Sequence, residues 1–345
     1  MASPSVGMLV RLGDRCGIAE HSGYFFAHLS PGLAKSYAQD PYSKDHGALL
    51  SRLMADDVRL VHVQYETALF RDTPALARLL ASLQATGVKV IMDLHSVPTN
   101  GAVLDVVDTV DCVIVHGQHA LDILKERAAT MDNSRFLPLA LPTVELDPVL
   151  SPIQRPSEFT VGTFGFIARH KGIVAACRSI KALHKEGLPI SLVVVGSAHP
   201  MNAQDAEYLE LKRMENEVPW LHLVDEFLSV EESVAALAQC DALVFNYMVD
   251  SSSGSGAAPL AALAGRPLVL SESKMLRGIP GIVYGYNHNP KLEVALRKLW
   301  VNKSLRERLG KEARAWAIER SGAIVAKQYE TLYDEILAGS FPRIE

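Results

Sequence analysis

A run of serines and glycines, Ser251–Gly256, is the part of this sequence whose residue types point most clearly to chemistry. It follows an apolar run, Asp241–Tyr247, and precedes an alanine-rich segment that ends at Gly265–Pro267. This order predicts a strand, a loop and a helix, with the loop at the carboxyl end of the strand. A helix start presents free N–H groups and a positive dipole end, which favour phosphate. A serine-rich turn with a good N-cap accounts for the same residues equally well.

A second candidate follows the apolar run Phe159–Phe164, where Gly165 leads into the basic trio Arg169-His170-Lys171. Lysine and arginine placed just beyond the end of a strand can neutralise a diphosphate. For an isolated trio of this kind a solvated basic turn is the simpler interpretation, and these residues alone favour it.

The first part of the chain offers a glycine-containing loop and a histidine. Gly17 lies in a loop after the predicted strand Val6–Arg11 and before a helical segment, Gly23–Leu29. This helix start is a second candidate anion site, although the loop lacks the GxGxxG spacing of a dinucleotide fingerprint. His95 lies just beyond the predicted strand Lys89–Asp93. At that position a structural role and a functional role are equally expected.

Composition narrows the class of protein. The chain has 345 residues, 48% hydrophobic and 21% charged, and this length predicts two domains. A net charge of −5 without a dense Lys/Arg run argues against nucleic-acid binding as the main task. The four scattered cysteines indicate reduced thiols in a cytoplasmic protein. We expect no signal peptide and no transmembrane segment, and peripheral membrane contact stays open.

Short apolar runs alternate with amphipathic segments along the chain, which is the pattern of parallel α/β sheets. The predicted strands are Val6–Arg11, Leu60–Gln64, Lys89–Asp93, Cys112–Val115, Phe136–Pro138, Phe159–Phe164, Ile190–Val195, Leu221–Val224, Ala242–Asn246, Leu268–Leu270 and Gly281–Tyr284. The predicted helices are Pro74–Thr86, His119–Ala129, Val174–Lys185, Ala206–Glu217, Val230–Gln239, Pro290–Trp300, Leu305–Arg320 and Gly322–Leu337. A proline-rich linker, Leu141–Pro156, separates two doubly wound, Rossmann-like sheets expected to face each other across a cleft.

The segments CGIAEHS, VHVQYE, DLHS, FGFIARHKG, LVVVGS, DEFLS, CDALVFNY and SSSGSGA…ALAGRP follow one another in this order. Together they resemble the retaining glycosyltransferases of family 4, and the resemblance runs from about Val6 to the C-terminal helix. It implies the GT-B fold, with an acceptor-side domain at residues 1–150 and a nucleotide-sugar-binding domain at residues 151–321. It also implies that the C-terminal helix in residues 322–345 packs back on the first domain.

The resemblance also implies roles for single residues. Lys171 and Arg169 would stabilise the donor diphosphate, and His95 would contact the transferred sugar. The other donor-binding residues would be Gly17, Gly165, Gly196, Ser197, Phe227, Leu228, Ser253, Gly254, Ser255, Gly256 and Ala257. Glu20, His21 and Glu66 are candidates on the acceptor side, and the two glutamates are equally well read as solvated loop carboxylates or caps.

This chain departs from the family pattern at two places. Phe166 stands where the family usually has an arginine, so Arg169 would have to supply that charge. The family's paired glutamates would fall near Ser252 and Leu260, neither of which is acidic. Recognition of the donor ribose must therefore differ. Some family members that carry a Ser-Ser-Gly version of this loop also lack both acids, so the resemblance is compatible with activity.

The sequence thus predicts transfer of a sugar from a nucleoside-diphosphate sugar to an unidentified acceptor, with retention of anomeric configuration. No metal and no other cofactor is expected. The acceptor classes left open are glycans, lipid-linked sugars, proteins and modified nucleic-acid bases. The alternative is a catalytically degenerate subunit that binds a sugar nucleotide or a partner without turnover, because both glutamates are missing.

Overall fold

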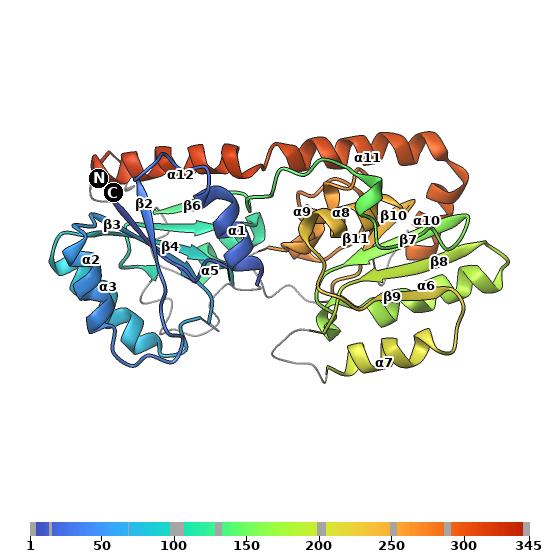
Figure 1. The fold of residues 1–345 in the computed structure, drawn as a ribbon, viewed down its shortest axis with the longest axis horizontal. Coiled ribbons are helices and arrows are strands. Elements are labelled where there is room, and N and C mark those ends of the chain that lie inside the picture. The colour runs from blue at the N-terminus through green and yellow to red at the C-terminus, as the bar shows by residue number, and fades with distance from the viewer. Residues whose placement is uncertain are drawn as a thin grey trace. The chain divides into compact units, whose positions relative to one another are not determined.

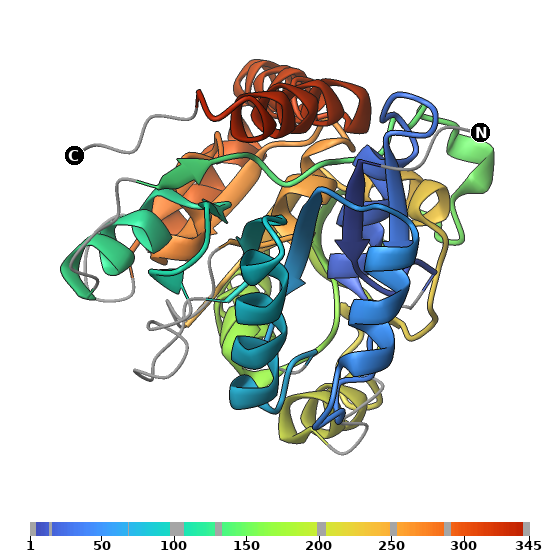
Figure 2. The ribbon, with the colours of Figure 1, turned by 90° about the vertical axis from the view of Figure 1, so that its left-hand side faces the viewer.

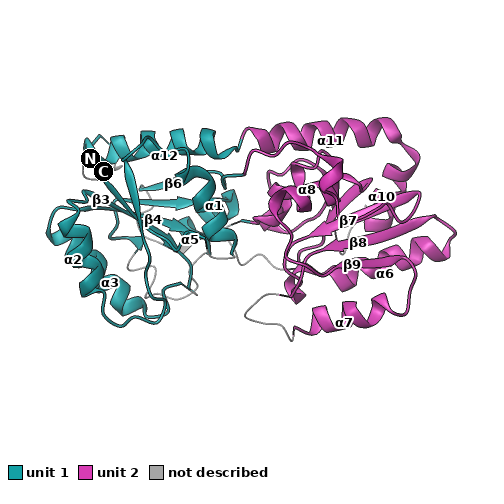
Figure 3. Cartoon of the chain, viewed as in Figure 1, with its two compact units in different colours: residues 1–141, 251–254, 320–345 teal, residues 142–250, 255–319 magenta. Residues whose placement is uncertain are grey.

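The computed structural model describes residues 5–13, 16–67, 69–96, 107–127, 133–198, 205–248, 254–285 and 291–340. It contains two six-stranded sheets in which every pair of neighbouring strands is parallel (Figure 1). Contacts divide the chain into two compact units, shown in Figure 3. Unit 1 comprises residues 1–141, 251–254 and 320–345, and unit 2 comprises residues 142–250 and 255–319.

Unit 1 has the strand order β2-β1-β3-β4-β5-β6. Its strands are β1 (Val6–Leu9), β2 (Ala34–Tyr37), β3 (Leu60–Tyr65), β4 (Lys89–Leu94), β5 (Cys112–Val115) and β6 (Ser134–Phe136). Its helices are α1 (Gly17–Phe26), α2 (Gly47–Ala55), α3 (Thr73–Ala85), α5 (Gln118–Arg127) and α12 (Gly322–Leu337). Because the strands are parallel, all their carboxyl ends lie at one edge of the sheet, where ligands of such folds bind.

Alternation of side chains along the strands gives unit 1 two apolar layers. Val61 and Val63 of β3 pack in the core beneath α2 and α3, whereas Leu60 packs in the core shared with α1 and α12. Helix α12 packs along α1, with the rings of Phe25 and Tyr329 stacked at a centroid distance of 4.2 Å. Figure 2 shows α12 (red) on the side of the sheet opposite to α2 and α3. The C-terminal helix is therefore an integral part of unit 1.

Unit 2 has the strand order β12-β11-β10-β7-β8-β9. Its strands are β7 (Phe159–Phe164), β8 (Ile190–Val195), β9 (Leu221–Val224), β10 (Ala242–Phe245), β11 (Leu268–Ser271) and β12 (Ile282–Tyr284). Its α-helices are α6 (Ile173–Lys185), α7 (Ala206–Glu215), α8 (Val230–Ala238), α9 (Ala257–Ala262), α10 (Leu292–Val301) and α11 (Lys303–Ile318). The chain winds away from β7 in both directions, so the strand order reverses between β7 and β10. In open parallel sheets this reversal point is the usual place for a ligand.

The predicted alternation of strands and helices is confirmed in both units. The strands Cys112–Val115, Phe159–Phe164, Ile190–Val195 and Leu221–Val224 and the helix Gly322–Leu337 have the bounds expected from the sequence. These elements are continuous apolar runs or long amphipathic segments, for which periodicity is most informative. No helix within the described ranges is long and apolar enough to cross a membrane.

Several other expectations were wrong in detail. The edge strand β2 and the short helix α2 were missed, since neither has a long apolar run to reveal it. Helix α1 begins at Gly17, not Gly23, because the Cys16 thiol caps it by accepting a hydrogen bond from Ala19 N at 3.4 Å. Strand β6 lies two residues before the predicted segment Phe136–Pro138.

The approach of α12 to α1 depends on a glycine. A Cβ placed on Gly322 would lie 2.2 Å from the carbonyl oxygen of Tyr24, a contact that only a backbone shift can relieve. We expect Gly322→Ala to lower the free energy of unfolding by about 1–3 kcal/mol. A Cβ placed on Gly23 of α1 would have no atom within 4 Å, so Gly23→Ala should raise the free energy of unfolding by about 0.5–1 kcal/mol. Urea unfolding of both variants tests this, and equal stabilities would contradict the close approach.

Candidate active site

The predicted site residues fall into two groups, one in each unit. Gly17, Glu20, His21, Glu66, His95 and Gly254 belong to unit 1. Lys171, Arg169, Gly165, Gly196, Ser197, Phe227, Leu228, Ser255, Gly256 and Ala257 belong to unit 2. Ser253 lies outside the described residues.

The unit 2 group gathers at the point where the strand order reverses. Gly165 follows β7 with a φ of +106°, a conformation that favours glycine. A Cβ at this position would lie 2.7 Å from Lys171 Nζ and 3.0 Å from Ala257 Cβ. The missing side chain of Gly165 therefore makes room for the Lys171 ammonium, which lies close to the first residue of α9.

Lys171 comes from a 3-10 turn, Arg169–Lys171, and not from an open loop. Its Nζ lies 5.7 Å from the centre of the Tyr247 ring, a cation–π contact. No carboxylate within the described ranges lies at ion-pair distance from this ammonium. A lysine held by a glycine backbone and an aromatic ring, with no counter-ion among the described residues, is suited to binding an anion.

One residue of the serine-glycine loop, Ser255, has a structural role. The Ser255 hydroxyl accepts a hydrogen bond from Ala258 N at 3.2 Å and lies 2.8 Å from the Tyr247 hydroxyl. Ser255 therefore caps α9, as the simpler interpretation of the sequence expects. Ala257, the first residue of α9, borders the space beside Gly165 that the Lys171 ammonium also borders.

The ends of β7 and β8 are locked together by backbone contacts. Ile167 N donates to Ser197 O at 2.9 Å, and Gly196 packs directly on the backbone of Gly165. Beside them Phe166, which replaces the family arginine, pairs with Phe227 at a ring-centroid distance of 6.2 Å. Phe227 is 46% exposed, so this aromatic pair offers a surface on which a planar ring could stack.

Arg169 takes a different direction from Lys171. It is exposed on the 3-10 turn, and its charge acts on Glu207 of α7, whose pKa is raised overall by burial. Glu207 in turn accepts a hydrogen bond from Val174 N at 2.8 Å, near the start of α6.

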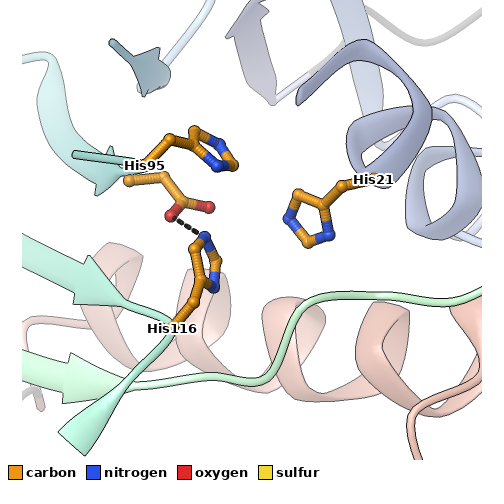
Figure 4. A group of neighbouring side chains, drawn as sticks. His21, His95 and His116 are labelled. Carbon is orange, nitrogen blue, oxygen red and sulfur yellow. Dashed lines mark ion pairs between the residues drawn. The ribbon is translucent and has the colours of Figure 1, made fainter. Parts of the chain in front are cut away.

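In unit 1 four titratable side chains converge at the carboxyl ends of the strands (Figure 4). Asp93 is in β4, His95 directly follows β4, His116 directly follows β5, and His21 comes from α1. Each offers a side-chain nitrogen or oxygen, and these atoms all lie within 4.8 Å of one another. His116 also lies beside Gly254, the last residue of the serine-glycine loop that belongs to unit 1.

Asp93 is the centre of this cluster, and its side chain is fully buried. Its Oδ2 accepts hydrogen bonds from Tyr329 of α12 at 2.6 Å and from the Gln64 amide at 3.2 Å. Its Oδ1 lies 2.7 Å from His116 Nε2. His62 Nε2 approaches Oδ2 to 3.4 Å. The carboxylate thus links three neighbouring strands to the C-terminal helix.

Hydrogen-bond partners define which ring nitrogens carry protons. Gln64 Nε2 faces Asp93 and lies 3.0 Å from His62 Nε2, so the Gln64 amide oxygen accepts from His95 Nε2–H, at 2.8 Å. His116 Nδ1–H donates to Leu137 O at 2.9 Å. His95 therefore keeps its lone pair on Nδ1, and neutral His116 keeps its lone pair on Nε2.

The charges of the cluster follow from burial and from the Asp93 carboxylate. Burial alone would raise the pKa of Asp93, but His116 and His62 hold it well below its ordinary value. Burial opposes protonation of His116, yet Asp93 and the Leu137 carbonyl raise its pKa. Burial lowers the pKa of His95 to about 3, and the pKa of His21 also lies well below its ordinary value. Within the cluster, burial thus favours the neutral forms of His95 and His21, whereas the Asp93 carboxylate favours protonation of His116.

The remaining unit 1 predictions lie around α1 and β3. Gly17 is the first residue of α1, and half-buried Glu20 lies in its first turn, where burial raises its pKa. Glu66 directly follows β3, and its carboxylate accepts a hydrogen bond from the Thr67 hydroxyl at 2.7 Å. The Glu66 carbonyl accepts from Phe70 N at 3.1 Å, so this residue also closes a turn.

Sequence reasoning missed most of the unit 1 cluster. It singled out His21 and His95 but not the residues that surround them, which are Gln64, His62, Asp93, His116 and Tyr329. The first four carried a usable signal, because they are polar residues in or just after predicted strands, and the structure places these strands side by side. Tyr329 carried none, since it is one of several aromatic residues on an amphipathic helix.

Comparison with known proteins identifies the class of fold. Neither a family model nor a curated protein matches this chain in sequence. Sucrose-phosphate synthase from Thermosynechococcus elongatus is similar in structure, with a TM-score of 0.72 and 15% identity over 97% of this chain and 100% of that chain. Anabaena HepE in complex with UDP-glucose has a TM-score of 0.70 and 14% identity, over 95% of this chain and 99% of that chain. The catalytic domain of Arabidopsis thaliana starch synthase IV, bound to ADP and acarbose, has a TM-score of 0.62 and 12% identity, over 84% of this chain and 76% of that chain.

These structural neighbours are GT-B glycosyltransferases, and the similarity extends over nearly the whole chain. The chain therefore has the GT-B fold, which confirms the predicted fold class.

The Tyr329 hydroxyl should be important for stability. Tyr329→Phe leaves the buried Asp93 carboxylate without one of its donors, so we expect the free energy of unfolding to fall by about 1–3 kcal/mol. The hydroxyl of Tyr208 makes the same bond to Asp225 at 2.7 Å in a solvated position, so Tyr208→Phe should cost less than about 1 kcal/mol. Chemical denaturation of both variants measures the difference, and equal losses would show that the Asp93 network adds nothing.

Proposed function

We propose that this protein is a retaining glycosyltransferase that uses a nucleoside-diphosphate sugar. The observation that carries the proposal is the Lys171 ammonium at the strand-order reversal of a GT-B sheet, where it lies against Gly165 and no carboxylate of the described residues is at ion-pair distance. An anion bound there would meet Lys171 and the start of α9 together. As the diphosphate leaves, Lys171 would stabilise its growing negative charge.

The structural neighbours support a nucleotide sugar as the donor. HepE is described in complex with UDP-glucose, and the starch synthase domain is bound to ADP. In this chain, we propose that the Phe166–Phe227 pair, with Gly196, Ser197 and Leu228, holds the nucleobase by stacking and backbone contacts. Arg169, exposed on the same turn as Lys171, would add positive charge at longer range.

Unit 1 would supply the contacts to the sugar and the acceptor. We propose that His95 contacts the transferred sugar, with Gly17 near the phosphates and Glu20, His21 and Glu66 on the acceptor side. In the transfer step the acceptor oxygen bonds to the anomeric carbon while the bond to the diphosphate breaks. The acceptor proton passes to the leaving phosphate on the same face, which gives retention. Lys171 supplies the positive charge, so this step needs no metal at the diphosphate.

A binding protein without turnover is the second candidate. It is favoured by Ser252 and Leu260 standing where the resembled family has glutamates. At the second of these positions, helix α9 has the buried apolar side chain of Leu260 where the family has an acidic one. Release of nucleoside diphosphate separates the two functions, because only an enzyme releases it.

Lys171→Ala should lower nucleoside-diphosphate release by about a hundredfold or more, because the leaving group loses its charged donor. The measurement uses purified protein with UDP-, GDP-, ADP- and dTDP-sugars and a panel of acceptors. Lys181→Ala, an exposed lysine on α6, is the matched control and should leave the rate unchanged. Release by Lys171→Ala at the wild-type rate would overturn the role of Lys171. No release by wild type with any donor and acceptor would favour the binding protein.

Gly165→Ala should weaken nucleoside-diphosphate binding, because the new methyl group occupies the space of the Lys171 ammonium. Loss of a charged contact predicts about a tenfold or larger rise in Kd. Gly187→Ala introduces a similar positive-φ strain, at φ +89°, where nothing lies within 4 Å, so its Kd should be unchanged. Calorimetric titration with UDP, GDP, ADP and dTDP measures both variants, and equal affinities would place the anion elsewhere.

A further inference from the structure

We propose that Asp93, His95 and His116 form a binding site for a divalent transition-metal ion of the zinc type in unit 1. The proposal concerns this chain's own side chains and does not depend on glycosyl transfer. It goes against the expectation of no metal that came from the sequence resemblance.

The first argument is a group of buried polar atoms that lack hydrogen-bond partners. Within the part of the chain that the structure describes, Asp93 Oδ1, His116 Nε2 and His21 Nε2 are buried without one. Asp93 Oδ1 and His116 Nε2 are 2.7 Å apart but are not aligned for a hydrogen bond to each other. Buried polar atoms are rarely unsatisfied, and three in one place call for an explanation. The two atoms form the ion pair drawn in Figure 4, and an ion bound between them would replace that contact and move them apart.

The second argument is that the outer atom of each proposed ligand is already held. His116 Nδ1–H donates to Leu137 O, and His95 Nε2–H donates to the Gln64 amide oxygen. Asp93 Oδ2 accepts from Tyr329 and Gln64. Metal-binding histidines and carboxylates usually have partners of this kind, which fix the tautomer and the ring orientation. The side-chain atoms that these partners do not use are Asp93 Oδ1, His95 Nδ1 and His116 Nε2, and in the proposed site these atoms bind the ion.

His21 differs from the other two histidines. Ala140 N–H donates to His21 Nδ1 at 2.7 Å, so a neutral His21 must carry its proton on Nε2. That nitrogen points into the cluster, as Figure 4 shows, but a protonated nitrogen cannot bind a metal. His21 Nε2–H is instead placed to donate to a further ligand of the ion, such as water or an anion. The site would have three protein ligands and an open position, as catalytic zinc sites do.

The ligand set selects the class of metal. Two imidazoles and one carboxylate suit Zn²⁺, Co²⁺ or Fe²⁺, whereas Ca²⁺ and Mg²⁺ prefer oxygen ligands alone. Zinc–nitrogen bonds of about 2.0–2.1 Å place tetrahedral ligand atoms roughly 3.3 Å apart. The four side chains already bring one such atom each within 4.8 Å of one another. In the metal-bound form the Asp93 carboxylate contributes one negative charge to the ion, and His116 binds the ion as a neutral imidazole.

Titration with Co²⁺ and Zn²⁺ tests the proposal on the whole protein after chelator treatment and dialysis, in the absence of any sugar nucleotide. We expect wild type to bind one equivalent of Co²⁺ with the visible absorption of a four- or five-coordinate site, and Zn²⁺ to displace it. Asp93→Asn and His116→Gln should each weaken Zn²⁺ binding by about a hundredfold or more, whereas His184→Gln, on the exposed surface of α6, should not. His21→Gln should keep the affinity within about tenfold but shift the Co²⁺ spectrum.

A second measurement uses wild type alone, in case a variant does not fold. X-ray absorption of the Zn²⁺-loaded protein should show a four- or five-coordinate ion with two imidazole ligands. No stoichiometric Co²⁺ binding, a zinc ion bound by oxygen atoms only, or unchanged affinity in folded Asp93→Asn and His116→Gln would each overturn the proposal. These results do not test the proposed transferase function, because that function is tested separately by nucleoside-diphosphate release and its loss in Lys171→Ala.

Discussion

A buried carboxylate is the constraint on which unit 1 depends. Asp93 has no exposed surface, so its charge must be met by protein groups or folding would incur a large desolvation cost. The partners come from β3, from the segment after β5 and from α12, through Gln64, His116 and Tyr329. Removing any one of these elements would leave the carboxylate under-satisfied. The C-terminal helix is therefore tied to the sheet by electrostatics as well as by apolar packing.

In unit 2 a charged side chain is positioned by the close approach of two backbone segments. The loops after β7 and β8 pack so tightly that Gly196 lies on the Gly165 backbone, and Lys171 occupies the space beside Gly165. The ammonium is positioned by shape and by the Tyr247 ring, and no carboxylate in the described ranges neutralises it. A lysine arranged in this way keeps its charge available for a ligand.

The order of strands and helices was predictable because it depends on local periodicity, as in Cys112–Val115 and Gly322–Leu337. The helix cap by Cys16 was not, because cysteine seldom has that role. The histidine cluster was only partly predictable. His95 stood out beyond a strand end, but the bond between Asp93 and Tyr329 joins residues 236 positions apart. Contacts at that separation arise from tertiary packing, which no local pattern in the sequence reports.

The unsatisfied groups of the two units indicate ligands of opposite charge. In unit 2 the Lys171 ammonium has no carboxylate at ion-pair distance among the described residues, and in unit 1 a carboxylate and three histidines bring one polar atom each within 4.8 Å of one another. The serine-glycine loop adds less to this contrast than its composition indicates, since Ser255 is used to cap α9. The features of unit 2 that suit an anion are therefore mainly the Lys171 ammonium and the space beside Gly165 that it occupies.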